Sequence, residues 1–266
     1  TILFSACSHT QTKKITLAEL TRSVFYTPQY VALEKGFFAD EGLDVDLQTT
    51  WGGDKTMTAL LSDHAEIALV GAETSVYVHA QDATDTIINF AQLTQTDGTF
   101  LVAKEPIDNF TWEDVRDEIF LGQRKGGMPQ MVGEFVLKQH DINPHKDLEE
   151  LIQHIDFANI PSAFASGDAQ FVQLFEPTAS VFEQEGKGHV VASFGEESGQ
   201  IPYTVFMTKE SMIENDRETI EKFTRAIYKA QKWVEETDAE QIAKVIEPYF
   251  EDSTLDILTA SVKRYK

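Results

Sequence analysis

The sequence predicts an α/β protein made of two lobes. Strand-like and helix-like segments alternate from Ile15 onward, and a second alternating block begins near Glu105. Such alternation favours a parallel-type sheet covered by helices. A late strand at 201–210 can return the chain to the first block, and 266 residues suffice for two units of ordinary domain size. We therefore expect residues 15–104 and 205–266 in lobe 1, residues 105–204 in lobe 2, and a hinge of two crossings.

The first block begins with the strand 15–20, which reads ITLAEL, followed by a helix at 28–35. Thr27 is a good N-cap for that helix, Pro28 is a good first helical residue, and Gly36 can end it. The remaining segments continue the alternation. They are strands at 43–50, 66–71, 86–93 and 99–104, and helices at 54–63 and 73–81.

The second block is expected to contain two helices, each with a proline that can start it, namely Pro129 and Pro177. Its segments are strands at 118–123, 169–175 and 188–194, helices at 129–140 and 177–185, and the return strand at 201–210. The last third is helical and charged, at 217–236, 239–250 and 254–266. In the first of these helices, side chains with i, i+3, i+7 spacing predict one buried face: Ile220, Phe223, Ile227 and either Ala230 or Gln231.

The chain is strongly acidic, with 22 basic and 44 acidic side chains and a formal charge of 22 − 44 = −22. Such a charge repels phosphate backbones and anionic lipid headgroups, so we expect no nucleic-acid partner and no peripheral membrane binding. Part of this charge is simply a solvated surface that keeps the protein soluble.

The single cysteine, Cys7, excludes an intramolecular disulfide and follows a short apolar run in TILFSACS. This pattern is typical of the end of a bacterial lipoprotein signal, in which the cysteine is acylated after cleavage. We expect residues 1–14 to comprise a signal-peptide remnant, the lipobox and a polar tether, with Cys7 as the lipidation site and a second acyl chain for stable anchoring. The alternative is an ordinary cysteine near a frayed terminus.

The loops after the predicted strands carry glycines, small hydroxyl residues and single charges. In open α/β sheets, ligands bind beyond the carboxyl ends of the strands, so these loops are the candidate ligand site. They are the stretches 22–26, TTWGGDKT at 49–56, GAET at 71–74, TQTDGT at 94–99, GQRKGGMPQ at 122–130 and FEPT at 175–178. Free backbone N–H groups near Gly126 and Gly127 favour an anion or another acceptor, and Glu176 stands at a strand end.

Catalytic and metal-binding patterns are absent from the sequence. No HExxH or GxSxG motif occurs, the glycine pair at 126–127 is not part of a Walker A loop, and the histidines are scattered. His140 and His145 in HDINPH could suggest zinc, but surface histidines are the commoner interpretation. We therefore expect recognition without catalysis, with no cofactor and no metal.

Several of these stretches together carry a family resemblance. FYTPQYVALEKGFFADEGLDVDL, GGDKTMTALLSDHAEIALVG, FLVAKEP, KGGMPQM, FEPTAS and IPYTVFMTKES resemble the SsuA/THI5-like substrate-binding lipoproteins of ABC importers (the NMT1, nitrate/sulfonate/taurine type). The resemblance implies a type II periplasmic-binding-protein fold, whose two lobes close on a small molecule and deliver it to an ABC permease and ATPase. It also implies a lipid-anchored monomer on the extracellular face of the cell membrane, in a Gram-positive bacterium.

The resemblance also assigns the ligand positions, in the order in which the loops occur. They are Ser23, Phe25 and Tyr26; Gly52, Gly53 and Asp54; Gly71, Ala72, Glu73 and Thr74; Gly126, Gly127 and Met128; Glu176; and Tyr203. The segment TRSVFYTPQY departs from the D-W-x-P-N-x-x-H pattern of the thiamin-pyrimidine binders, which argues against the same pyrimidine contacts.

The expected ligand has two different ends. The Gly126–Met128 loop favours a negative or acceptor end, whereas Glu176 favours a donor such as an amine, and an aromatic contact with Phe25 or Tyr26 can add about 1 kcal/mol. An amino-sulfonate or an amino-substituted heterocycle satisfies both ends, whereas bare nitrate satisfies only the first. The alternatives are a thiamin-precursor binding protein, a pyrimidine-synthase-like enzyme on the same fold, and a ligand-sensing domain of a regulator.

Overall fold

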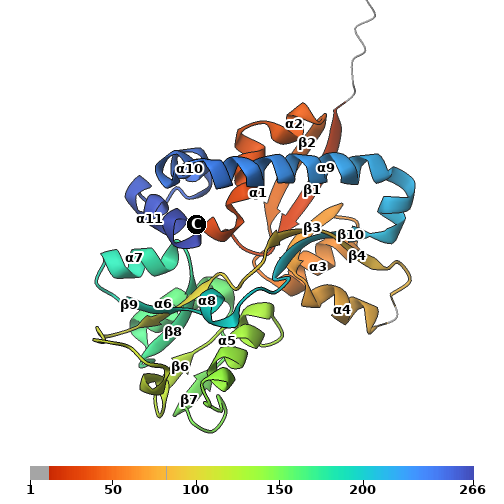
Figure 1. Ribbon diagram of the computed structural model, residues 1–266. Helices are drawn as coiled ribbons and strands as arrows, with labels where there is room; N and C mark the ends of the chain where they lie inside the picture. The colour runs from red at the N-terminus through yellow and green to blue at the C-terminus, as the bar shows by residue number, and fades with distance from the viewer. Residues whose placement is uncertain (1–11, 82) are drawn as a thin grey trace, which may run out of the picture.

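The computed structural model describes residues 12–81 and 83–266, which form two α/β lobes, each around a five-stranded sheet (Figure 1). The first sheet contains, in spatial order, β2 (Leu43–Thr49), β1 (Lys13–Glu19), β3 (Ile67–Gly71), β10 (Thr204–Lys209) and β4 (Ile87–Thr94). β1 is parallel to both β2 and β3, whereas β10 runs antiparallel between β3 and β4. The predicted return strand therefore lies inside the first sheet.

The second sheet contains, in spatial order, β7 (Glu150–Ile152), β6 (Ile119–Leu121), β8 (Phe171–Phe175), β5 (Thr99–Ala103) and β9 (His189–Ser193). β6 is parallel to β7 and β8, and β5 is antiparallel to β8 and β9. The chain crosses between the two sheets at residues 95–98 and again at 199–203, which gives the two crossings that the sequence predicted.

The prediction that the strand at 99–104 belongs to lobe 1 is wrong. β5 pairs with β8 and β9, so lobe 2 begins at Thr99 and not at Glu105. All five residues of β5 are buried, and a continuous apolar strand of this kind carries no local signal for the sheet it joins. The partner strands come much later in the chain, so only the tertiary fold assigns it.

The helices of the first lobe occupy the connections between its strands. They are η1 (Val24–Tyr26), α1 (Thr27–Glu34), α2 (Phe37–Asp40), α3 (Gly53–Leu61) and α4 (Glu73–His79). Thr27 is the first residue of α1 and not its N-cap, and its hydroxyl donates to the carbonyl of Val24 at 2.6 Å. The side-chain cap in this loop is Ser23, whose oxygen accepts from the N–H of Phe25 at 3.2 Å.

The second lobe contains η2 (Trp112–Val115), α5 (Met128–Gln139), η3 (Phe157–Asn159), α6 (Ile160–Ser166), α7 (Thr178–Gln184) and α8 (Phe194–Ser198). The sequence predicted α5 and α7 within one residue at each end. It did not predict β7, η3, α6 or α8, all of which are short, nor the four-residue α2 of the first lobe.

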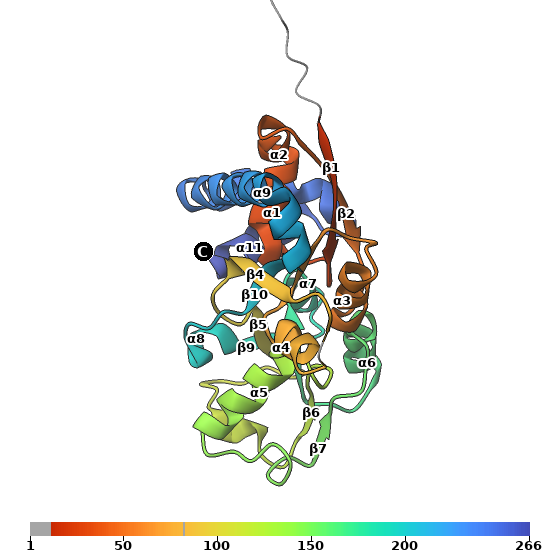
Figure 2. The same ribbon diagram turned by 90° about the vertical axis from the view of Figure 1, so that its right-hand side faces the viewer.

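The C-terminal third forms α9 (Glu210–Glu236), α10 (Ala239–Ile246), η4 (Glu247–Tyr249) and α11 (Leu255–Tyr265). α9 starts earlier than predicted and contains a non-helical residue, Asp216. Its predicted face is buried, because Ile220, Phe223, Ile227 and Ala230 all lie in the core of the first lobe. Figures 1 and 2 show α9 along the first lobe and α11 at the level where the two lobes meet.

Each lobe has its own apolar core, and the hinge lies between them. One cluster fills the first lobe, and two further clusters lie in the second lobe, where Leu101 belongs to one and Phe100 to the other. No helix in the described part of the chain is long and apolar enough to cross a membrane.

Candidate ligand site between the lobes

A small enclosed cavity of about 40 Å³ lies between the lobes, beside the hinge. Lobe 1 and lobe 2 both contribute to its wall, as does the second crossing. The lining residues are Leu20, Tyr26, Gly53, Val70, Gly71 and Glu73 from lobe 1, Gly127, Met128, Pro129, Phe157 and Phe175 from lobe 2, and Tyr203 and Thr204 at the return to β10.

The topology explains why these residues converge. β1 and β3 are parallel, so their carboxyl ends lie at the same edge of the first sheet, where ligand sites of open α/β sheets form. Three helices also begin at the cavity, because Gly53, Glu73 and Met128 are the first residues of α3, α4 and α5. Helix N-termini present backbone N–H groups that have no partner within the helix.

Glu73 connects the two lobes across this cavity. Its Oε1 accepts a hydrogen bond from the backbone N–H of Met128 at 2.9 Å. Its Oε2 is buried and has no hydrogen-bond partner among the described residues. Burial raises the pKa of the Glu73 carboxyl, and the backbone N–H groups of Glu73 and Met128 oppose that shift. The carboxylate lies over Gly71, where any Cβ would collide with it.

Tyr203 forms the hinge side of the cavity. Tyr203 is 2% exposed, and its hydroxyl lies next to the buried Asp97 carboxylate, whose Oδ2 has no other partner among the described residues. Burial raises the pKa of the Tyr203 hydroxyl, and the charge of Asp97 and a hydrogen bond to its carboxylate raise it further. Asp97 itself is buried, and burial raises the pKa of its carboxyl to about 6, although its Oδ1 accepts from the backbone N–H of Thr99 at 2.6 Å.

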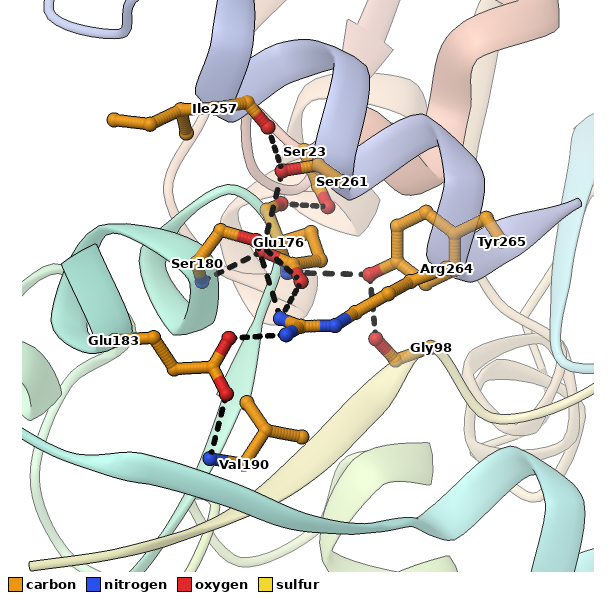
Figure 3. Close-up of polar contacts among 10 residues, drawn as sticks. All are labelled: Ser23, Gly98, Glu176, Ser180, Glu183, Val190, Ile257, Ser261, Arg264 and Tyr265. Atoms are coloured by element: carbon orange, nitrogen blue, oxygen red, sulfur yellow. Dashed lines mark hydrogen bonds and ion pairs between the residues drawn. The ribbon is translucent and has the colours of Figure 1, made fainter.

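Glu176 does not line this cavity, and its carboxylate is already paired with other parts of the protein, so these contacts give no support to its predicted contact with a ligand donor. Its side chain has no exposed surface and accepts from Arg264 Nη1 at 2.6 Å, from the N–H and the hydroxyl of Ser180 at 2.9 Å each, and from the Ser261 hydroxyl at 3.2 Å (Figure 3). Arg264 and Ser261 belong to α11, whereas Ser180 belongs to α7. The carboxylate therefore ties the C-terminal helix to lobe 2.

Ser23 and Phe25 are also structural parts of the hinge. The Ser23 hydroxyl donates to the backbone carbonyl of Glu176 at 2.9 Å, which joins the two lobes (Figure 3). The ring of Phe25 lies edge-on to that of Tyr203, with 5.7 Å between the ring centroids, and tilted against that of Tyr265, with 4.9 Å between the centroids. Neither residue lines the enclosed cavity, whereas their neighbour Tyr26 does.

The remaining predicted residues lie around the cavity or in grooves beside it. Gly53, Gly71, Gly127 and Met128 line the cavity itself. A groove of about 360 Å³ beside it is lined by Asp54, Thr74 and Gly126, and the Asp54 carboxylate faces Arg124 of lobe 2 at 3.5 Å. A second groove, of about 520 Å³, is lined by Ala72. Gly52 is the exception, because it is buried and lines none of these spaces.

The cavity is also lined by residues that were not among the predicted ligand positions, namely Leu20, Val70, Pro129, Phe157, Phe175 and Thr204. Pro129 and Phe175 lie within the candidate loops, and Leu20 and Val70 lie at or next to the ends of predicted strands. Thr204 lies inside the predicted return strand, so the rule that located the loops does not reach it. Phe157 lies in η3, a short segment without a distinctive pattern, and no sequence signal points to it.

A buried polar cluster holds the loop after β1 in place. The Glu19 carboxylate accepts from Arg22 Nε at 2.9 Å, from the Gln29 amide at 2.7 Å and from the Tyr30 and Thr49 hydroxyls at 2.8 Å each. Burial raises the pKa of Glu19, and Arg22 opposes this shift. Arg22 also lines an open groove of about 790 Å³ that both lobes border. Its guanidinium is paired with Glu19 and lies over the rings of Tyr30 and Tyr249, at 5.5 and 5.2 Å from their centroids.

No group of three or more His, Cys, Asp or Glu side chains that could hold a metal ion occurs within residues 12–81 and 83–266. His140 and His145, the pair that could suggest zinc, instead contact carboxylates. His140 lies 2.8 Å from Glu197, and His145 lies 3.5 Å from Glu134. Cys7 lies outside the described residues, so its predicted lipidation has no structural test.

Two α/β lobes, two crossings between them and a cavity at the hinge define the type II periplasmic-binding-protein fold, as the sequence predicted. The chain belongs to the NMT1-like family, whose model matches residues 10–247. It is 60% identical over 263 residues to the Bacillus subtilis (strain 168) protein named "Putative binding protein YtlA", and the match covers 98% of this chain and 78% of that protein.

Solved structures share the fold at low sequence identity. The alkanesulfonate-binding protein SsuA from Xanthomonas axonopodis pv. citri, bound to MOPS, is 13% identical with a TM-score of 0.76, and the match covers 94% of this chain and 83% of that one. The periplasmic nitrate-binding protein NrtA from Synechocystis PCC 6803 is 16% identical with a TM-score of 0.75, and the match covers 95% of this chain and 70% of that one. At these identities, the likeness establishes the fold and not the ligand.

Proposed function

We propose that the chain is the extracellular solute-binding component of an ABC importer. It captures a small organic solute between its lobes and delivers it to a permease and ATPase. The observation that carries this proposal is the cavity beside the hinge, because both lobes and the second crossing line it. Membership of the NMT1-like family and the 60% identical relative named as a binding protein support it.

We expect the solute to be captured by closure of the two lobes about the hinge. A solute that contacts both lobes binds the closed arrangement better than the open one, and only this difference in affinity can shift the equilibrium toward closure. Glu73 of lobe 1 and Met128 of lobe 2 already meet at 2.9 Å, so the closed arrangement brings groups from both lobes within reach of one ligand. An open arrangement would separate them and admit the solute.

The experiment is a thermal-shift screen of the purified chain against amino-sulfonates, pyrimidines, amines and small anions, followed by calorimetry of any solute that raises the melting temperature. A ligand that binds the folded state stabilises it by mass action, by about 2.7 kcal/mol at one hundred times its Kd. The proposal fails if no small solute in a broad library stabilises a sample that is verified as folded and monomeric.

The same experiment separates the alternatives. A thiamin-precursor binding protein would be stabilised by aminopyrimidines above all other compounds. A pyrimidine-synthase-like enzyme would convert its ligand, so mass spectrometry after incubation would find a product. For a binding component, we expect the ligand to be recovered unchanged.

The proposed location is the extracellular face of the cell membrane, through a lipid on Cys7. The support is the TILFSACS pattern followed by a polar tether. Expression of the precursor in a Gram-positive host tests this proposal: the protein should fractionate with membranes and carry acyl chains by mass spectrometry, and Cys7→Ala should release it. A wild-type protein without acyl chains would contradict the anchor while leaving solute binding open.

A further inference from the structure

The charge of the enclosed cavity points to a class of solute. Among the residues that line it, all of them within the described part of the chain, Glu73 is the only one with a charged side chain. A second buried acid, Asp97, interacts with the hydroxyl of Tyr203. A buried carboxylate favours a ligand of opposite charge and disfavours a second anion in the same low-dielectric space.

The backbone N–H of Met128, which could donate to an anionic ligand, already donates to Glu73. The sequence suggested that the loop before α5 binds an acceptor, and the structure shows that this acceptor is the Glu73 carboxylate, whose Oε1 takes the Met128 N–H at 2.9 Å. A sulfonate or nitrate at this position would have to displace Glu73 or lie beside it as a like charge. The protein's own carboxylate therefore occupies the position of an anionic ligand group.

Two buried oxygens around the cavity can still accept a hydrogen bond: Glu73 Oε2, which has no partner among the described residues, and the Tyr203 hydroxyl, whose proton is directed to Asp97. Buried polar groups are nearly always paired, and an unpaired one costs free energy. The Glu73 carboxylate can only accept when it is ionised, and the Tyr203 hydroxyl has acceptor lone pairs as well as a proton. A ligand group with several N–H donors would satisfy both oxygens.

The walls of the cavity suit a cation as well. Tyr26, Phe157, Phe175 and Tyr203 contribute aromatic side chains to it. Aromatic ring faces attract ammonium and guanidinium groups, more strongly where water is excluded.

The size of the cavity limits what enters it. Its volume of about 40 Å³ is a few times the roughly 10–15 Å³ that a single water molecule needs on the same measure, so it admits a headgroup of a few heavy atoms, such as an ammonium or amidinium group. Glu73 and Met128 also line the adjoining groove of about 520 Å³ between α4 and α5. Its apolar side chains include Val76, which is 63% exposed, and Phe135, which is 49% exposed.

We infer that the solute carries a small protonated-nitrogen headgroup on an apolar body, as in a primary amine or an amidine. The headgroup lies in the enclosed cavity, where it donates to Glu73 Oε2 and to the Tyr203 hydroxyl. The body extends past Met128 into the groove between α4 and α5. This inference rests on the proposed solute-binding function and gives it a ligand class opposite in charge to the anions named for the two solved structures above.

The test uses probes that differ only in the charge of the headgroup. Calorimetry at pH 7 compares benzylamine, benzyl alcohol and benzenesulfonate, then butylamine, butan-1-ol and butane-1-sulfonate, with nitrate as a further anion. We expect the two amines to bind and the alcohols and anions to bind at least about tenfold more weakly, because a hydrogen bond to a charged group is among the strong ones.

Single substitutions test which side chains contact the amine. Glu73→Gln keeps an acceptor for the Met128 N–H and should weaken amine binding about tenfold or more, and Tyr203→Phe should weaken it about threefold or more. The matched control is Glu214→Gln, which removes the same charge from an exposed position on α9. It should leave amine binding unchanged. Phe135→Ala should weaken benzylamine while leaving methylamine unaffected, because only benzylamine has a body that reaches the groove.

Several outcomes overturn the inference. It is wrong if sulfonates or nitrate bind while the amines do not, although solute binding as a function then stands. It is also wrong if neither charge class binds the folded wild type, and the broader function fails only if the full library is negative too. Equal losses of amine affinity in Glu73→Gln and Glu214→Gln would refute the assigned contact between the amine and Glu73. Thermal melts verify the folding of each variant. If Glu73→Gln does not fold, the ligand class is tested by the wild-type series of amine, alcohol and sulfonate together with Tyr203→Phe.

Discussion

Replacement of Arg264 by alanine tests whether the C-terminal helix is fastened to lobe 2 by a buried charge. Arg264 Nη1 lies 2.6 Å from the Glu176 carboxylate, and its Nη2 pairs with Glu183 (Figure 3). The Glu176 side chain has no exposed surface, whereas that of Arg264 is 27% exposed. The substitution therefore leaves a carboxylate in the interior without its cation.

The expected loss in the free energy of unfolding is about 3 kcal/mol. Removal of one partner of a buried ion pair costs roughly 3–5 kcal/mol, because the other charge stays buried without compensation. Two features place Arg264 at the lower end of this range. Its guanidinium is partly exposed, so solvent screens the pair, and Ser180 and Ser261 still donate hydrogen bonds to the carboxylate after the change.

Urea denaturation at pH 7, followed by circular dichroism, measures this loss. The control is Arg217→Ala, which breaks an ion pair with Glu221 whose side chains are 75% and 54% exposed. That change should cost no more than about 0.5 kcal/mol. The double variant Glu176→Gln/Arg264→Ala should recover part of the loss, since it leaves no buried charge. An Arg264→Ala variant as stable as Arg217→Ala would refute the reasoning.

Three further substitutions test the hinge and the core. Burial raises the pKa of Asp97 from 3.8 to about 6, so the folded state keeps a proton that the unfolded state releases, and the free energy of unfolding falls as the pH rises between about 4 and 6. Asp97→Asn, which can still accept from Thr99, should flatten this slope and raise the free energy of unfolding at pH 8 by up to about 3 kcal/mol. Urea titrations between pH 4 and pH 8 measure the free energy of unfolding, and a variant profile that overlays that of the wild type would contradict the role of Asp97. Gly98→Ala should cost about 1–3 kcal/mol, because the new Cβ collides with the ring of Phe25, and an unchanged melting temperature would show that the hinge adapts freely. Phe223→Ala removes a fully buried ring from the core of the first lobe and should cost about 3–5 kcal/mol in the same denaturation assay, whereas a loss below 1 kcal/mol would mean that the core refills the space.

The order of the elements was predictable from local patterns. The alternation of strands and helices, the amphipathic spacing of α9 and the late return strand all appear in the sequence and all occur in the structure. The short elements β7, α2 and α6 were missed, because segments of three to seven residues carry too little periodicity to be recognised. β5 was assigned to the wrong lobe, because its pairing partners are distant in the chain.

The site was predictable as a set of loops but not as a set of contacts. Tyr26, Glu73, Met128 and Tyr203 do line the cavity, and their role in binding stays a prediction. Glu176 stands at a strand end as expected, yet its carboxylate faces Arg264, which lies 88 positions later in the sequence. No rule based on neighbouring residues could have found that partner.

Local sequence patterns were enough to predict the family, the two-lobed fold and the loops from which the site is built, because periodicity, helix starts and strand ends are properties of neighbouring residues. Which charges meet follows from the three-dimensional fold alone. It paired Glu176 with Arg264 inside the hinge and left Glu73 as the charge in the cavity. The physical reason is that a carboxylate's role depends on the donors and the burial around it, and distant parts of the chain supply both.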